Sequence, residues 1–551
     1  MEDLKDNFLF RLFSNNRFLL VFGAVLFSVA ALPIIGQKFS FADPFIIFYL
    51  LLGFFVTGVF ILKKSLNDYL IPYLLLQYVI VFIFFDKKYI GSFGPELKLY
   101  AMVFALGLLM CGYYVFKHFK YLWQNFLIFR LFWIFFLSNV VYFAIGYFSD
   151  FRLRGDDMYL IKKQMISLGF NSMAFSSFIR DFSDEAKFSI YIASLVPIVS
   201  IMVSLMSFYG IETREEIHKR LKFTVIFGLI SFLLYYAGAI ASIFLGLSVI
   251  MFDNGRLLGN FLGAASNMGY IYYISVYCLI FISYRLYLKI RSVDLGAFKH
   301  LMFLCDMIFY LTVFIILTHI SKTNIIALLF GIFTIYFSLK IFDRNLINIK
   351  KIEINPFYKI IIFAFVAGGL ILFFQKFDFD MYIWKLQERF TNLFTWNTRL
   401  IHWGAFMERW FSNLNIINLF FGFGLDSSMN VIYEISNSIG REPGLVQIHN
   451  TYLGTIFETG IFGILYFWGI FSTGYDSFKT LGISRADYFE KFFSAVNLGI
   501  IVFILIQWTT VEITMPAKIV LFCAIGFTES VKFAFKQIRI KEENEKIACQ
   551  S

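Results

Sequence analysis

Residues 358–375 read YKIIIFAFVAGGLILFFQ, and the interval of about 75 residues from there to Asn450 contains no comparable apolar run. The apolar stretch is long enough to cross the hydrocarbon core of a bilayer as one helix. The interval after it is polar and aromatic, and in hydrocarbon its backbone groups would lack hydrogen-bond partners. We therefore expect a membrane helix that leads into a loop domain at one face of the membrane.

The whole 551-residue chain has the composition of a polytopic membrane protein. Hydrophobic residues make up 59%, aromatic residues 21% and charged residues only 15%, with a mean hydropathy of +0.73. Apolar stretches of membrane-spanning length recur along the chain. We predict an all-α fold with about fourteen transmembrane helices, near 18–35, 45–62, 69–85, 97–116, 126–148, 188–208, 223–248, 265–288, 301–318, 324–342, 358–375, 451–472, 492–510 and 517–535.

These spans predict three parts of the chain. Residues 1–375 hold eleven helices and an outer segment at 149–187. Residues 376–450 form a large, helical periplasmic loop domain. Residues 451–551 hold the last three helices and a cytoplasmic tail.

Lys and Arg orient the spans. The short segments on the side of the N-terminus hold 28 of these residues, and the short loops on the other side hold six. Because positive residues stay on the cytoplasmic side, we expect both termini in the cytoplasm and the segments 149–187 and 376–450 outside. The same distribution explains the net charge of +11 without a nucleic-acid partner, since basic residues at the inner face meet anionic lipid.

The first pattern on the expected outer face is residues 449–453 (HNTYL), followed by Glu458 and Gly460. A histidine at the mouth of a span can titrate near neutrality and accept a proton from a hydroxyl. The alternative is that Asn450 only caps the helix and His449 is an interfacial polar residue.

The second pattern is residues 399–403 (RLIHW) in the large loop. An arginine beside aromatic rings can stack on them or form a two-pronged contact with phosphate oxygens. The alternative is that Arg399 anchors an amphipathic interfacial helix, with Trp396 and Trp403 in the aromatic belt. Residues 416–424 (IINLFFGFG) are too short to span and are interpreted as re-entrant or interfacial.

Two further patterns lie in short outer loops. In residues 255–261 (GRLLGNF), glycines let the backbone approach a ligand and Arg256 is a phosphate candidate, although a tight turn with a snorkelling arginine is the alternative. In residues 318–324 (THISKTN), Ser321 and Lys322 could line a cavity, although a short turn has the same composition.

Taken in order, these patterns resemble those of the O-antigen ligase and polymerase family of bacterial envelope glycosyltransferases. The resemblance covers about residues 223–475. The matching residues are Arg256, Gly259, Asn267, Ser321, Arg399, Trp403, His449, Asn450, Leu453, Glu458 and Gly460. Lys322 departs from the family's usual Arg, Ala264 and Ala265 depart from its Asn-Pro, and residues 168–171 (LGFN) offer Asn171 as a second counterpart of Asn267.

The resemblance implies an inverting, metal-independent glycosyltransferase that needs no cofactor. Its donor would be a polyprenyl-diphosphate-linked glycan at the periplasmic face of the bacterial inner membrane. Arg256 and Arg399 would neutralise the leaving diphosphate, and His449 would take the proton of the acceptor hydroxyl. The substrate-binding residues would be Ser321, Lys322, Trp403, Asn450 and Glu458.

The resemblance leaves two acceptors open. A polymerase transfers the glycan to a lipid-linked repeat unit, and a ligase transfers it to the lipid A core. We expect the polymerase, because fourteen spans and two long outer segments exceed the more compact ligases, and a chain-length regulator and a flippase of the same pathway would be its partners. A lipid-linked sugar flippase or another transporter is the third alternative, and it would predict internal repeats and ionisable groups at mid-membrane.

Overall fold

The structure is a computed structural model of residues 1–551. It describes residues 115–148, 198, 200–221, 251–253, 256–258, 322–342, 360, 387, 397–412, 416–422, 450–483, 486, 488–509 and 515–550. The described part of the chain is mainly helical, which confirms the predicted helical class there, with one two-stranded exception.

The helices are α6 (Phe119–Asn125), α7 (Leu127–Phe148), α14 (Lys322–Phe342), α17 (Asn397–Ser412), α18 (Ile416–Phe421), α20 (Thr451–Thr459), α21 (Phe462–Gly482), α22 (Tyr488–Trp508) and α23 (Met515–Gln550). The exception is an antiparallel hairpin of β1 (Met251–Asp253) and β2 (Arg256–Leu258), in which Asp253 pairs with Arg256. It lies where an outer loop is expected.

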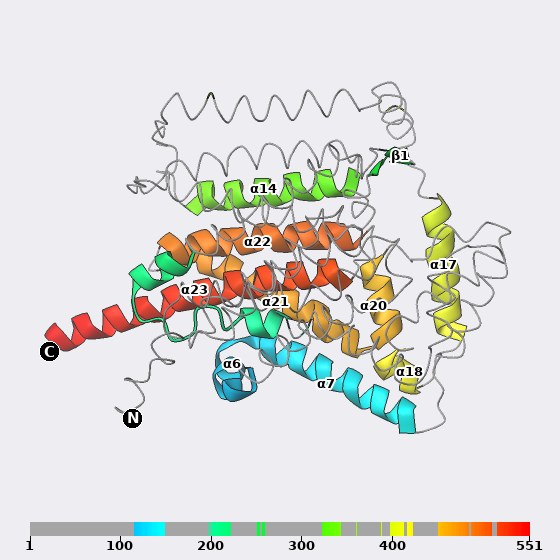
Figure 1. Cartoon of the computed structure of the whole chain (residues 1–551), viewed down its shortest axis with the longest axis horizontal. Helices are drawn as coiled ribbons and strands as arrows, with labels where there is room; N and C mark the ends of the chain where they lie inside the picture. The colour runs from blue at the N-terminus through cyan, green and yellow to red at the C-terminus, as the bar shows by residue number, and fades with distance from the viewer. Residues whose placement is uncertain are drawn as a thin grey trace, which may run out of the picture.

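The long helices form a bundle. Figure 1 shows α14, α22, α23, α21 and α7 running along the long axis of the molecule, with α22 packed against α14, α21 and α23, and α21 against α7. Glycines let two of these pairs approach closely: an added Cβ at Gly499 would overlap Ile335 of α14, and one at Gly469 would lie 2.7 Å from the Phe132 ring of α7. Small residues at helix contacts are typical of membrane bundles.

Polar side chains share the interior of the bundle with its aromatic core. Ser204, Ser477, Asn497, Gln507 and Thr528 are fully buried. The outward faces are apolar instead. The exposed large apolar side chains on α21 are Ile464, Trp468, Phe471, Tyr475 and Phe478, and those on α14 are Ile326, Leu329, Phe330, Phe333, Tyr336, Phe337 and Ile341. This distribution is the reverse of that on the surface helices of a water-soluble protein, whose outward faces are polar.

The described helices can be compared with the expected spans. The ranges 126–148, 324–342 and 492–510 coincide with α7, α14 and α22. Among the described residues, α22 alone is long and apolar enough to cross a membrane by itself, and the pair α6–α7, bent by 118°, passes the same test together. The expected spans before residue 115 and those at 223–248, 265–288, 301–318 and, apart from residue 360, 358–375 lie outside the described residues, as does the outer segment 149–187.

One expected helix near the C-terminus is broken, and another extends past its expected span. The span expected at 451–472 is broken at Gly460 into α20 and α21, because the backbone there turns through φ 60°, ψ −144°. The last helix does not end near residue 535 but continues to Gln550. Its 36 residues reach about 54 Å, well beyond the roughly 30 Å of a bilayer core.

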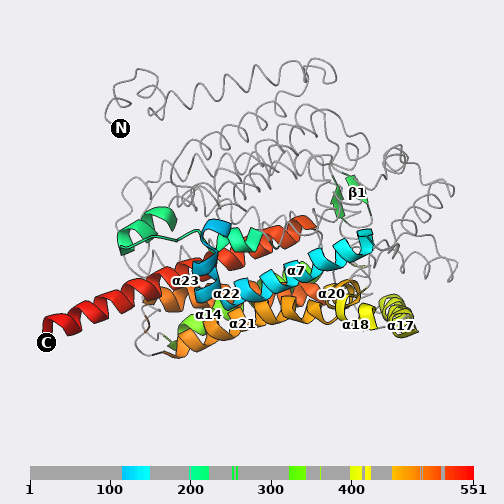
Figure 2. The ribbon, with the colours of Figure 1, turned by 90° about the horizontal axis from the view of Figure 1, so that it is seen from below.

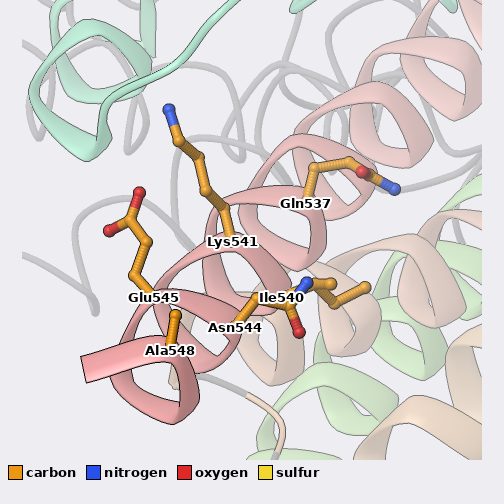
Figure 3. A pocket seen from close by; sticks show the side chains of 6 residues that line it. All are labelled: Gln537, Ile540, Lys541, Asn544, Glu545 and Ala548. Carbon is orange, nitrogen blue, oxygen red and sulfur yellow. The ribbon is translucent and has the colours of Figure 1, made fainter. Parts of the chain in front are cut away.

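The C-terminal half of α23 lies at the end of the bundle opposite α17 (Figure 1). Arg214 holds a second segment against it, donating hydrogen bonds from Nε (3.0 Å) and Nη2 (2.8 Å) to the Glu542 carboxylate. These bonds lower the pKa of Glu542 below its ordinary value. An open groove of about 470 Å³ follows one face of this part of α23 (Figure 3), lined by Gln537, Ile540, Lys541, Asn544, Glu545 and Ala548.

Candidate functional site

Three short helices gather at the other end of the bundle. In Figures 1 and 2, α17, α18 and α20 lie together at the end of the bundle where α7 ends and α21 begins, and the β1–β2 hairpin lies at the same end of the molecule. Three of the segments that the sequence assigned to an outer face, together with the first part of the span expected at 451–472, are therefore at one end of the structure. They come from residues 251–258, 397–412, 416–421 and 451–459.

The helix that carries Arg399 and Trp403 packs on the helix that follows His449. Phe406 of α17 is 1% exposed, and its ring centroid lies 4.3 Å from that of Phe457 on α20. An aromatic contact of this kind buries a large apolar area and fixes the pair. Trp403 itself is half-buried one turn earlier on α17.

Asn450 begins α20. Its backbone is extended (φ −151°, ψ 107°), and its Oδ1 accepts a hydrogen bond of 3.1 Å from the Leu453 N–H. This is an N-cap, which satisfies one of the free donors of the first helical turn. The cap gives the buried Asn450 side chain a hydrogen-bond partner. A substrate-binding role for Asn450 stays a prediction.

The far end of α20 is also well fixed. Glu458 is buried in its last turn, where the backbone of Gly422 packs against Glu458 and Thr459. Tyr452, in the first turn, donates a hydrogen bond of 3.2 Å to the Leu505 carbonyl of α22. The short helix α20 is thus held by the bundle at one end and by α18 at the other.

The remaining candidates are placed only in part. His449 and Ser321 lie outside the described residues. The backbone puts Arg256 first in β2, Lys322 first in α14 and Arg399 in the first turn of α17, while their side chains lie outside the described part of the chain. Among the residues that the structure describes, no group of three His, Cys, Asp or Glu could hold a metal ion.

No protein-family model matches this chain, and no curated protein matches it in sequence.

A charged network that was missed by sequence reasoning runs from the buried Lys532 and Glu529 inside the bundle to the exposed Asp476. The Lys532 ammonium, 5% exposed, donates to Asp476 Oδ2 (2.6 Å), Glu529 Oε1 (2.7 Å) and Ser477 Oγ (3.3 Å). Asn497 Nδ2 donates to the same Glu529 oxygen at 2.6 Å. The signal was present, because Glu529 and Lys532 interrupt an apolar run three residues apart, on one face of a helix.

The network joins three helices and uses all of its own donors. Each of the three ammonium protons of Lys532 has an acceptor, from α21 or α23, and Asn497 brings in α22. Two turns further along α23, Arg539 repeats the arrangement with the buried Glu490 of α22 at 2.7 Å. A saturated network of this kind specifies how helices pack.

Proposed function

We propose that the chain is a polytopic membrane protein in which the bundle of α7, α14, α21 and α22 lies in lipid, with the outward faces of its helices in contact with the hydrocarbon. The outward apolar faces of α14 and α21 support this proposal, because in water such long aromatic stripes would be costly to expose. The corner between α6 and α7 supports it too. There the chain bends by 118°, and the exposed Trp123 follows the exposed Lys117 and Lys120 in the sequence, a composition typical of a membrane–water interface.

Within that membrane protein, the proposed activity is inverting, metal-independent glycosyl transfer from a polyprenyl-diphosphate-linked glycan. The observation that carries it is the Phe406–Phe457 contact, which packs the helix of Arg399 on the helix whose cap follows His449. A cation for the leaving group and a base for the acceptor then come from neighbouring elements, as the reaction requires.

The proposed step forms one bond and breaks one. The acceptor hydroxyl oxygen attacks the anomeric carbon, and the bond from that carbon to the diphosphate oxygen breaks with its electron pair on the leaving group. His449 takes the hydroxyl proton, and Arg256 and Arg399 neutralise the diphosphate. Attack from the side opposite the diphosphate inverts the anomeric centre. Ser321, Lys322, Trp403 and Glu458 are proposed to hold the donor.

The proposed acceptor is a lipid-linked repeat unit, which makes the protein a surface-polysaccharide polymerase of the bacterial inner membrane. The glycan ladder of a deletion strain tests this against the ligase. One repeat unit on the lipid A core indicates a lost polymerase. A bare core, with long lipid-linked chains accumulating, indicates a lost ligase.

The Lys532 network is the observation that bears on a transporter, since ionisable groups inside a membrane bundle often mark a pathway. Here every ammonium proton of Lys532 is held by an acceptor of the chain itself. A carrier site would need open positions for its cargo. We therefore propose that the network stabilises helix packing, and we favour an enzyme over a transporter.

The proposed topology has a direct test. Single cysteines introduced at Ser176 and Ser428 should react with a membrane-impermeant thiol reagent in intact cells, because both positions are expected outside. A cysteine at Lys350 should react only after the cells are opened. Labelling of the Lys350 position in sealed cells would overturn the orientation derived from the Lys and Arg distribution.

The two arginines have a charge-conserving test. Arg256→Lys and Arg399→Lys keep the positive charge but lose the planar, two-pronged contact with a diphosphate. Each should impair transfer by purified protein while membrane levels stay normal. Arg409→Lys, in the same loop helix as Arg399 but outside the matched pattern, is the control. Wild-type activity of both test variants would identify the arginines as interfacial anchors only.

A further inference from the structure

Two glycines meet backbone to backbone where α18 touches the break between α20 and α21. Gly422 has φ +70° and Gly460 has φ +60°. A Cβ at Gly460 would lie 2.5 Å from the Leu419 carbonyl oxygen and 2.6 Å from the Gly422 nitrogen, and a Cβ at Gly422 would overlap the backbone of Glu458 and Thr459. Only glycine combines this backbone conformation with this separation.

A hydrogen bond crosses the same contact. The N–H of Ile461, just before α21, donates to the Leu419 carbonyl of α18 at 2.9 Å. Donors at a helix start lack partners within the helix. The break between α20 and α21 is thus completed by a residue from about forty positions earlier in the chain.

A third helix joins from the bundle. Tyr142 of α7 is buried, its hydroxyl donates to the Gly422 carbonyl at 3.2 Å, and its ring stacks on Phe421 at 5.5 Å with an 8° interplanar angle. Phe421 also contacts Phe462 at the start of α21. The end of α18 is therefore clamped between α7 and the α20–α21 break.

We infer that Tyr142, Gly422 and Gly460 are positioning residues, which fix α18, and α17 just before it, on α20 so that Arg399 is held at the reaction centre. The inference rests on the proposed function, which makes Arg399 a reacting group. The Phe406–Phe457 pair gives α17 one contact with α20. A loosened α18 removes the second support, so that α17 can rotate about that contact. A displacement of roughly 1 Å at a catalytic group can cost about 10²-fold in rate.

The kinetic test uses purified protein and a lipid-diphosphate glycan donor. Gly422→Ala and Gly460→Ala should lower kcat by about 10²-fold while the donor KM changes little. Tyr142→Phe keeps the ring stack, loses only the hydroxyl, and should lower kcat by up to about tenfold. Gly482→Ala, where an added Cβ meets no atom within 4 Å, and Gly210→Ala, with φ +71° but open space, are the matched controls.

A second measurement follows the position of α17 relative to the bundle and does not depend on activity. Spin labels at Phe411 of α17 and Trp468 of α21, both well exposed, give the distance between these helices in a cysteine-free background. We expect the distance distribution to broaden in the three junction variants and to stay sharp in both controls. If the alanine variants do not fold, the distance distribution and kcat of Tyr142→Phe test the inference.

The outcomes separate the two proposals. A sharp, unchanged distance in the junction variants overturns the positioning role, whatever happens to kcat. Broadened distances in a protein whose wild type shows no transfer from any lipid-diphosphate donor support the junction and refute the glycosyltransferase. Broadening together with a lower kcat supports both.

Discussion

Replacing His449 with alanine is expected to remove most glycan transfer without loss of membrane insertion. A base whose pKa lies near the ambient pH contributes about 10²–10⁴-fold to rate. The cap at Asn450 and the docking of Tyr452 on α22 involve neither ring nitrogen of His449, so α20 should form in the variant. The measurement is turnover of purified protein with a lipid-diphosphate glycan, with donor binding determined in parallel.

Donor binding should survive in His449→Ala, because the diphosphate contacts are assigned to the arginines. His402→Ala is the matched control, since that histidine belongs to none of the matched positions, and it should retain most activity. Wild-type turnover by His449→Ala would show that His449 is not the general base and only precedes the start of α20.

Replacing Lys532 with methionine is expected to be the most destabilising single change in the described bundle. It leaves the Glu529 carboxylate, only 7% exposed, without its cation. Removing one partner of a buried ion pair typically costs about 3–5 kcal/mol, because the other charge stays buried and uncompensated. Thermal unfolding in detergent, followed by the retained soluble fraction, should show a large loss of stability.

Rescue and control variants make this second prediction specific. Glu529→Gln in the Lys532→Met background removes the stranded charge and keeps an amide for Asn497, so much of the stability should return. Lys536→Met, one turn further along α23 and exposed, should have little effect. Equal stability of Lys532→Met and wild type would mean that the ion pair does not hold α21 and α23 together.

The sequence predicted the helices of this chain better than their ends. Length and hydropathy predicted the ends of α7 and α22 to within a few residues, because a long uninterrupted apolar run is typical of a single membrane-spanning helix. The same criterion failed at Gly460, where hydropathy continues but the chain turns. That turn depends on Leu419 and Gly422, which no local pattern connects to residue 460.

The candidate site was predictable in its parts and not in its assembly. The pattern 449–453 indicated a helix start, and Asn450 does cap one. The contact between α17 and α20 through Phe406 and Phe457 could not be predicted from the sequence. Both residues are ordinary apolar positions, and nothing local indicates which helix faces meet. The Lys532 network shows the same limit, because its partners come from three helices whose relative register is set by packing.

The two docking points on α20 have a consequence for how this chain can vary. Gly422 rests on the last turn of α20 and Asn450 caps its first turn, so the segment 423–449 starts and returns at points about 13 Å apart on one nine-residue helix. Both ends are fixed by contacts of residues outside the segment. Any change of length between residues 423 and 448 must therefore return the chain to the Asn450 cap at this same separation, so that His449 still directly precedes α20.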